Sequence, residues 1–165
     1  MKLRLLLLQE CNRTCKGCCN KDWDLDGLPK CQSYAGYESI FLTGGEAMLY
    51  PEKVKQVTAE VRKQTDAPVI LYTAKCDDAE ALIDVLKVVD GVTLTLHTRK
   101  DAPLFREFNA ALQRSGVTGK SLRLNVFNGI TVGDTDTSGW QLKTGIRWIK
   151  DCPLPTDEVF MQVAA

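Results

Sequence analysis

The sequence predicts an α/β fold in which mostly parallel strands alternate with helices. Apolar runs typical of buried strands are followed, four or five times, by stretches whose apolar residues recur at helical spacing. The first run, residues 3–8, lacks polar alternation, as expected of a parallel strand covered on both faces. The chain has 165 residues, whereas a closed eight-unit barrel takes ~250. We therefore expect a partial (incomplete) (β/α) barrel with about five or six mostly parallel strands.

Each expected strand is an apolar run that ends at polar or glycine-rich positions. The strands are expected at residues 2–9, 38–43, 68–73, 92–97 and 121–127, with further short strands at 146–149 and 159–163. Residues 21–36 are polar and are expected to form a loop or a short irregular helix. Residues 129–139 are rich in Gly, Asp and Thr, which predicts a long loop or a twisted hairpin.

Three helices are expected between these strands. Pro51 opens the first, which runs to about Gln64, because proline suits the first turn of a helix. Residues 77–80 resemble a capping box and start the second, and Pro103 begins the third, which Gly116 ends. Their inward positions follow helical spacing and are Val54, Val57 and Val61, then Leu82, Ile83, Leu86 and Val89, then Leu104, Phe105, Phe108, Ala111 and Leu112.

Composition narrows the class of protein. The chain carries 21 basic and 21 acidic residues, so a large basic face for nucleic acid is not expected. The apolar run near the start, residues 5–8, is too short for a membrane span or a secretory signal. We therefore expect one domain over residues 1–165, located in the cytoplasm, without membrane contact.

Cysteine spacing is the strongest chemical signal. Seven cysteines are present, and Cys11, Cys15 and Cys18 follow the first strand with C-x3-C-x2-C spacing. An odd count with such clustering favours metal binding over a disulfide framework. Structural zinc lacks a fourth ligand here, because Cys19 adjoins Cys18 and His97 lies far along the chain. Ordinary core cysteines would be a coincidence of spacing, whereas a four-iron, four-sulfur (4Fe-4S) cluster takes three thiolates and keeps one iron open.

Together with a second motif, these cysteines resemble the radical S-adenosylmethionine (radical SAM) superfamily. The second motif is Gly44-Gly45-Glu46, which comes directly after the second expected strand. The resemblance implies a partial barrel of the radical SAM type in which the three cysteines hold a 4Fe-4S cluster. It also implies that the reduced cluster cleaves S-adenosyl-L-methionine to a 5′-deoxyadenosyl radical, which abstracts hydrogen from a substrate. An external electron donor, flavodoxin- or ferredoxin-like, is implied as a partner.

The expected cofactor-binding residues lie at the carboxyl ends of the strands. Glycines 44 and 45 allow close backbone approach to a ligand, and Glu46 offers an acceptor for the methionine ammonium group. Ligands of open α/β sheets bind outside these strand ends, which adds Thr43, His97 and Asn125 as candidates. The alternative is an ordinary strand-to-helix turn at residues 44–46 and satisfied strand-end polarity at the others. No side chain is assigned as catalytic.

Asn20 and Trp23 extend the cysteine motif in a way that resembles the activating enzymes of glycyl-radical proteins, including that of anaerobic ribonucleotide reductase. This resemblance implies a glycyl-radical protein as partner and substrate. The chain departs from the pattern at Gly17, at Ala47 and on the fourth strand, where an Asp-x-Lys pattern is missing.

Two alternatives to an activase are considered. The first alternative is a compact radical SAM enzyme acting on a nucleotide, a peptide or another small molecule. The second is a non-catalytic iron–sulfur or zinc module. The remaining cysteines, Cys19, Cys31, Cys76 and Cys152, form no second cluster motif, and Cys76 and Cys152 are expected to be scattered thiols.

Overall fold

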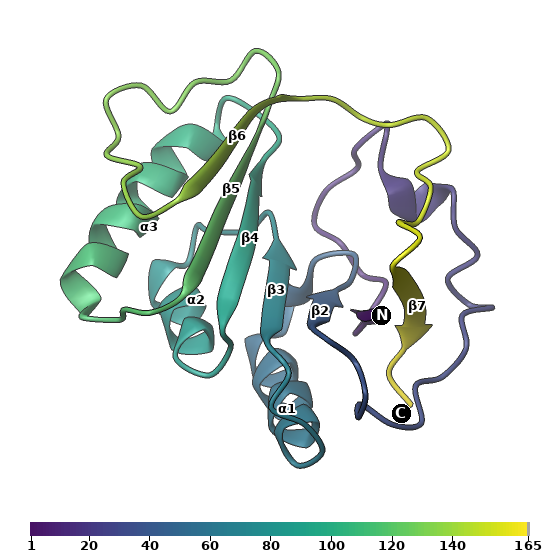
Figure 1. The fold of residues 1–165 in the computed structure, drawn as a ribbon. Coiled ribbons are helices and arrows are strands. Elements are labelled where there is room, and N and C mark those ends of the chain that lie inside the picture. Colours follow the sequence, from purple (N-terminus) through teal and green to yellow (C-terminus); the bar gives the residue numbers. More distant parts are fainter. Residues whose placement is uncertain (165) are drawn as a thin grey trace.

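The computed structural model describes residues 1–164 as one α/β domain around an all-parallel sheet in the order β6-β5-β4-β3-β2-β1-β7 (Figure 1). The strands are β1 (Lys2–Leu6), β2 (Ile40–Thr43), β3 (Val69–Thr73), β4 (Gly91–Leu96), β5 (Ser121–Phe127), β6 (Gln141–Ile146) and β7 (Glu158–Gln162). The helices are α1 (Pro51–Arg62), α2 (Ala79–Leu86) and α3 (Asp101–Ser115), with 3-10 turns η1 (Cys19–Lys21) and η2 (Ala47–Leu49). None of the helices in this part of the chain is both long and apolar enough to cross a membrane.

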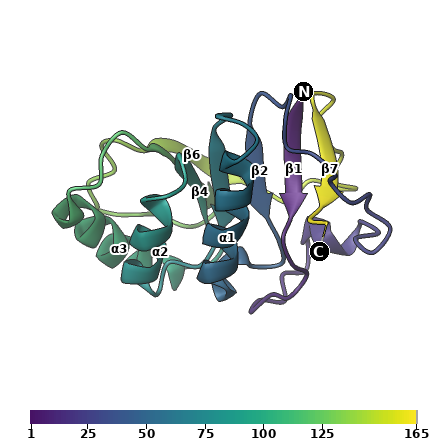
Figure 2. The same ribbon diagram turned by 90° about the horizontal axis from the view of Figure 1, so that it is seen from below.

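One face of the sheet packs against all three helices (Figure 2). Alternate strand residues such as Leu3, Leu42 and Leu94 point to this face and are completely buried. The apolar stripes expected on the helices meet them, and Phe105 and Phe108 of α3 are the largest completely buried side chains in this core. The helix-facing side of the sheet is therefore the main hydrophobic core.

The opposite side, here called the open face, is covered only in part. A small apolar cluster of Leu6, Leu25 and Phe160, with Trp23 packed against it, covers the sheet near β1 and β7. The rings of Trp23 and Phe160 meet edge to face with centroids 5.0 Å apart. Over β4 to β6 the open face carries mainly polar and charged side chains, such as Thr93, Arg123 and Lys143, and these line a hollow.

The α/β class with parallel strands is confirmed, and most expected elements are present with shifted ends. Seven strands are described instead of about five or six. Strand β1 ends at Leu6 rather than residue 9, and α3 starts at Asp101, so that Pro103 sits in the first helical turn. The expected strand at 146–149 is wrong, because β6 ends at Ile146. As an edge strand, β6 is mostly exposed and lacks the apolar pattern that marks the buried strands.

Candidate functional site

The cysteine motif lies on an irregular loop that leaves β1 at the carboxyl end of the sheet. Cys11 is exposed, Cys15 and Cys18 are half-buried, and all three are free thiols. The amide of Cys18 donates to the carbonyl of Cys15 at 3.2 Å, which closes a turn between them. Burial and then the neighbouring Cys18 thiol raise the pKa of Cys15. Among residues 1–164, no three His, Cys, Asp or Glu side chains converge as a ready-made metal site.

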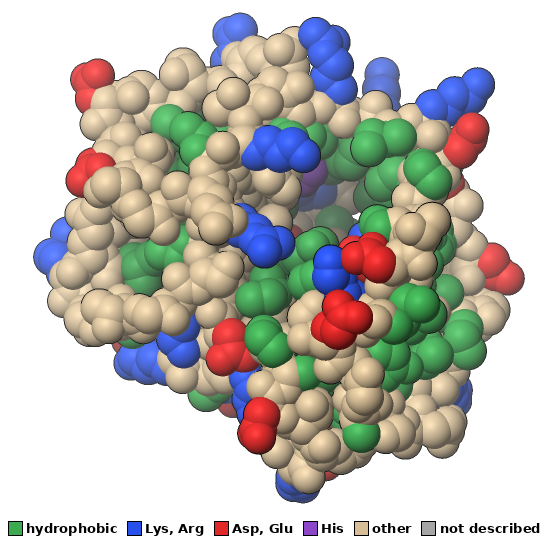
Figure 3. Space-filling model, viewed as in Figure 1, with side chains coloured by type: hydrophobic (Ala, Val, Ile, Leu, Met, Phe, Trp, Pro, Cys, Tyr) green, Lys and Arg blue, Asp and Glu red, His purple; other side chains and the backbone are tan. Residues whose placement is uncertain are grey.

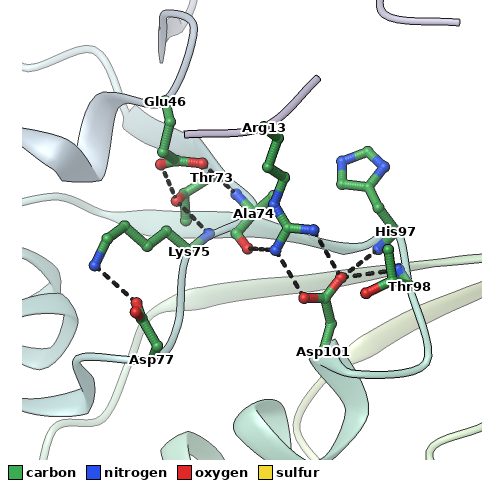
Figure 4. Close-up of polar contacts among 9 residues, drawn as sticks. All are labelled: Arg13, Glu46, Thr73, Ala74, Lys75, Asp77, His97, Thr98 and Asp101. Carbon is green, nitrogen blue, oxygen red and sulfur yellow. Dashed lines mark hydrogen bonds and ion pairs between the residues drawn. The ribbon is translucent and has the colours of Figure 1, made fainter. Parts of the chain in front are cut away.

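Arg13, between the first two cysteines, ties this loop to the end of β3 and the start of α3 (Figure 4). Its guanidinium donates to both carboxylate oxygens of Asp101, at 3.1 and 2.7 Å, and to the carbonyl of Ala74 at 3.0 Å. Asp101 begins α3, is 3% exposed, and also accepts from the amides of His97 and Thr98 at 2.9 Å. Burial raises the pKa of Asp101, but these hydrogen bonds, led by that from Arg13, outweigh burial and lower it overall.

The Gly-Gly-Glu segment pairs directly with the start of the cysteine loop. The Gly45 amide donates to Leu8 O at 2.9 Å, and the Glu46 amide donates to Glu10 O at 2.8 Å. A Cβ atom on Gly45 would lie 2.2 Å from Glu10 O and 2.3 Å from Gln9 O, so only glycine fits. The expected close approach at this glycine is therefore between two backbone segments of the protein itself.

Glu46 is buried at 4% exposure, and its carboxylate binds other parts of the protein. One oxygen accepts from the amide of Met48 at 3.0 Å and from the hydroxyl of Thr73. The other oxygen accepts from the amide of Ala74 at 2.9 Å (Figure 4). Glu46 therefore joins η2 to the end of β3, and the oxygen with one partner keeps capacity to accept a further donor.

All six residues expected to bind the cofactor line one cleft of about 340 Å³ between the cysteine loop and the ends of β2 to β5. We call it the rim cleft, and Figure 3 looks onto the hollowed face that contains it. Cys18 and Asn20 of the cysteine loop also line it. The amide group of Asn20 donates to Gly44 O at 2.9 Å and so ties the loop to the Gly-Gly-Glu segment. The expected residues that the rim cleft brings together are Thr43, Gly44, Gly45, Glu46, His97 and Asn125.

An aromatic cluster forms one wall of the rim cleft. The Trp148 ring stacks on His97 with centroids 5.2 Å apart and packs against Phe127 at 4.7 Å. A Cβ on Gly17 would lie 2.3 Å from Trp148 Cγ, so the indole rests against the cysteine loop at its glycine. Burial and the charge of Arg13 lower the pKa of His97, whose imidazole is therefore neutral at pH 7.

The expectation that Cys152 is a scattered thiol is wrong. A disulfide joins Cys152 to Cys19, with their Cα atoms 5.5 Å apart. It ties the segment between β6 and β7 to η1, directly after the third motif cysteine. Cys31 and Cys76 are free and buried, and burial raises the pKa of Cys76 to about 12, so this thiol stays protonated.

Sequence reasoning missed the contacts that position the site. Arg13 and Asp101 are 88 residues apart, and no local sequence pattern at either position indicates that they pair. The one available signal was an arginine inside the cysteine motif, where a charged side chain needs a partner once the loop folds back on the sheet. Trp148 also lines the rim cleft, although it belongs to neither motif.

Comparison with known proteins adds little to this geometry. No protein-family model matches the chain, and no curated protein matches it. Among solved structures, a chitinase from Rhizomucor miehei is similar with a TM-score of 0.43 and 16% sequence identity. The match covers 76% of this chain and 47% of the chitinase chain, so this chain spans about half of that protein. At this level the similarity carries no argument about function.

Proposed function

We propose that this chain is a radical SAM enzyme that forms a 5′-deoxyadenosyl radical and uses it to abstract hydrogen from a substrate. The observation that carries the proposal is the free state of Cys11, Cys15 and Cys18 beside one cleft that gathers the six expected cofactor-binding residues. The curved parallel sheet with β6 and β7 at its ends is compatible with a partial barrel of the radical SAM type.

The donor set of the loop fits an iron–sulfur cluster. Three thiolates suit such a cluster, and the only disulfide among the described residues spares all three. The thiols have to draw together on binding, which the irregular backbone permits, and metal sites commonly form as the metal binds. When bound by Cys11, Cys15 and Cys18, a 4Fe-4S cluster would supply the electron for reductive cleavage of S-adenosyl-L-methionine.

The protein's own groups then bind and orient the cofactor. Glu46 has an oxygen that can still accept from an ammonium group, and Asn125 offers an amide that also lines the cleft. Neutral His97 is held flat against Trp148, so this aromatic wall excludes water from one side. An external electron donor, flavodoxin- or ferredoxin-like, supplies the electron in this proposal.

Anaerobic reconstitution with iron and sulfide, reduction with dithionite and an assay for 5′-deoxyadenosine test the proposal. Cys15→Ala should lose both the broad iron–sulfur absorption and the product, because two thiolates hold the cluster poorly. Cys31→Ala, which removes a buried thiol outside the motif, is the matched control and should keep both. An intact reduced cluster without product would contradict the radical reaction and leave a non-catalytic module.

A glycyl-radical activase is one specific form of the proposal, and an enzyme acting on a small molecule is the other. Asn20 and Trp23, which carry that resemblance, here tie the loop to Gly44 and pack on Phe160. Both contacts hold the loop in place, so they do not distinguish a protein substrate from a small molecule. Electron paramagnetic resonance after mixing with a glycyl-radical protein encoded nearby tests this form, and a glycine radical is the expected signal.

A further inference from the structure

We propose that the open face binds an anionic group, a phosphate or a carboxylate, of a small-molecule substrate through Arg123 and Lys143. The inference rests on the proposed function in so far as the bound molecule is the substrate of the radical. It names a substrate class that the cysteine motif leaves undefined.

The strand register sets these two cations below the rim cleft. Arg123 pairs in register with Thr93 on one side and Gln141 on the other, and Lys143 pairs with Asn125 one row closer to the rim. A pocket of about 470 Å³ is lined by these residues and by Tyr72. We call it the strand pocket, and it shares Tyr72, Thr93 and Asn125 with the rim cleft. The two hollows therefore adjoin along the same strands.

Charge balance on the open face leaves a positive surplus at the strand pocket. Lys2 pairs with Asp157 at 2.7 Å, and Arg4 pairs with Glu158 at 2.8 Å. Within residues 1–164 neither Arg123 nor Lys143 forms an ion pair with an acidic side chain. An arginine and a lysine without acidic partners, facing one hollow, are the groups that bind phosphate or carboxylate.

Polar atoms without partners lie on the same face. The Thr93 hydroxyl is buried, with the residue 7% exposed, and forms no hydrogen bond within the described chain. The Nε of Arg4 and the Nδ1 of His97 are likewise buried without a partner in residues 1–164. Such atoms are rare in native proteins because each costs free energy when left unpaired. Of these residues, Thr93 lines the strand pocket, so its hydroxyl is a donor that a bound anionic molecule can satisfy.

Spacing along β5 limits the size of the substrate. Phe127 of the rim cleft lies four residues from Arg123, which corresponds to roughly 13 Å at ~3.3 Å per residue. A molecule that places its anionic group at Arg123 and its reacting carbon near the rim therefore has the length of a small metabolite. A glycine within a protein chain brings no charge of its own, so these cations favour a small anionic substrate over a glycyl-radical protein.

The test measures binding of inorganic phosphate and, separately, of acetate to the reconstituted protein by calorimetry at constant ionic strength. The double variant Arg123→Met, Lys143→Met should weaken binding at least about tenfold, because each lost charge–hydrogen-bond contact carries roughly that factor. Arg114→Met removes an exposed cation at the end of α3 and should bind like wild type. Arg123→Lys keeps the charge and should retain part of the affinity. Preference for phosphate or acetate identifies the anionic group.

Two outcomes overturn the inference. One is equal affinity of wild type and double variant for both anions. The other is a glycine radical formed equally well on a glycyl-radical protein by wild type and double variant. Failure of the wild-type protein to form 5′-deoxyadenosine overturns the proposed function instead, and phosphate binding that depends on Arg123 and Lys143 would still support the anion subsite.

Discussion

The helix-covered face and the open face of the sheet use the same strands but opposite kinds of side chain. On β4, Leu94 points to the helices and is completely buried among apolar residues. Its neighbour Thr93 points the other way, is nearly as buried, and has a hydroxyl without a partner in the described residues. The apolar side chains of the helix-covered face thus stabilise the fold. The open face keeps polar groups that cost stability when unpaired and that can bind a ligand.

The largest change in the free energy of unfolding is expected on β4, where the two kinds of side chain are neighbours. Leu94→Ala should lower the free energy of unfolding by about 3–4 kcal/mol, because it opens a cavity in the main core. Thr93→Val removes an unpaired hydroxyl and should change stability by less than about 1 kcal/mol, in the stabilising direction. Urea unfolding of both variants measures the difference. If Thr93→Val lowered the free energy of unfolding as much as Leu94→Ala does, the two faces would not differ in their contribution to stability.

The Arg13–Asp101 pair at the rim is of a different kind, since both groups are hydrogen-bonded and hold the cysteine loop in place. Arg13→Met should destabilise the protein by about 2–3 kcal/mol at pH 7, because it leaves the Asp101 carboxylate buried without its guanidinium. Asp101→Asn in the same background should recover part of the loss, since the remaining group is neutral. Additive losses in the double variant would show that the two residues do not act as a pair.

The pH dependence of the same variant sharpens this interpretation. The pKa of Asp101 is lowered in the folded protein, so its stabilising contribution is complete above the unfolded value near ~3.9 and is lost as pH falls through the folded value. In Arg13→Met the pKa of Asp101 should be higher than in the wild type, because the hydrogen bond and the charge of Arg13 that lower it are gone, so the variant loses less stability on acidification. The stability gap between wild type and variant should therefore narrow from pH 7 towards pH 4. A gap that widens on acidification would assign the effect to another group.

The sequence predicted the elements whose signal is local. Helical spacing identified Val54, Val57 and Val61, and the two motifs identified Cys18 and residues 44–46, which line one cleft. The missed features have no local signal. Strand β6 is exposed on an edge, and the Cys19–Cys152 disulfide spans 133 residues. Likewise, the roles of Glu46 as a cap of η2 and as a partner of Thr73 depend on how loops pack, which spacing alone does not encode.

The smallest loss of stability is expected at Gly45, where the Gly-Gly-Glu segment meets the start of the cysteine loop through backbone alone. Gly45→Ala should cost about 1–2 kcal/mol, because its Cβ would press on the carbonyls of Gln9 and Glu10, which are backbone and have to shift with the loop. Gly27→Ala is the matched control, since its Cβ would meet only the side chain of Asp24, which can rotate away in this exposed turn. Thermal unfolding compares the two, and iron–sulfur absorption after reconstitution reports whether the thiols still converge. We expect Gly45→Ala to lose cluster content more than its stability loss alone would require, because the carbonyls it displaces immediately precede Cys11. Full cluster content in a destabilised Gly45→Ala protein would show that the Gly-Gly-Glu segment supports the fold without positioning the cysteines.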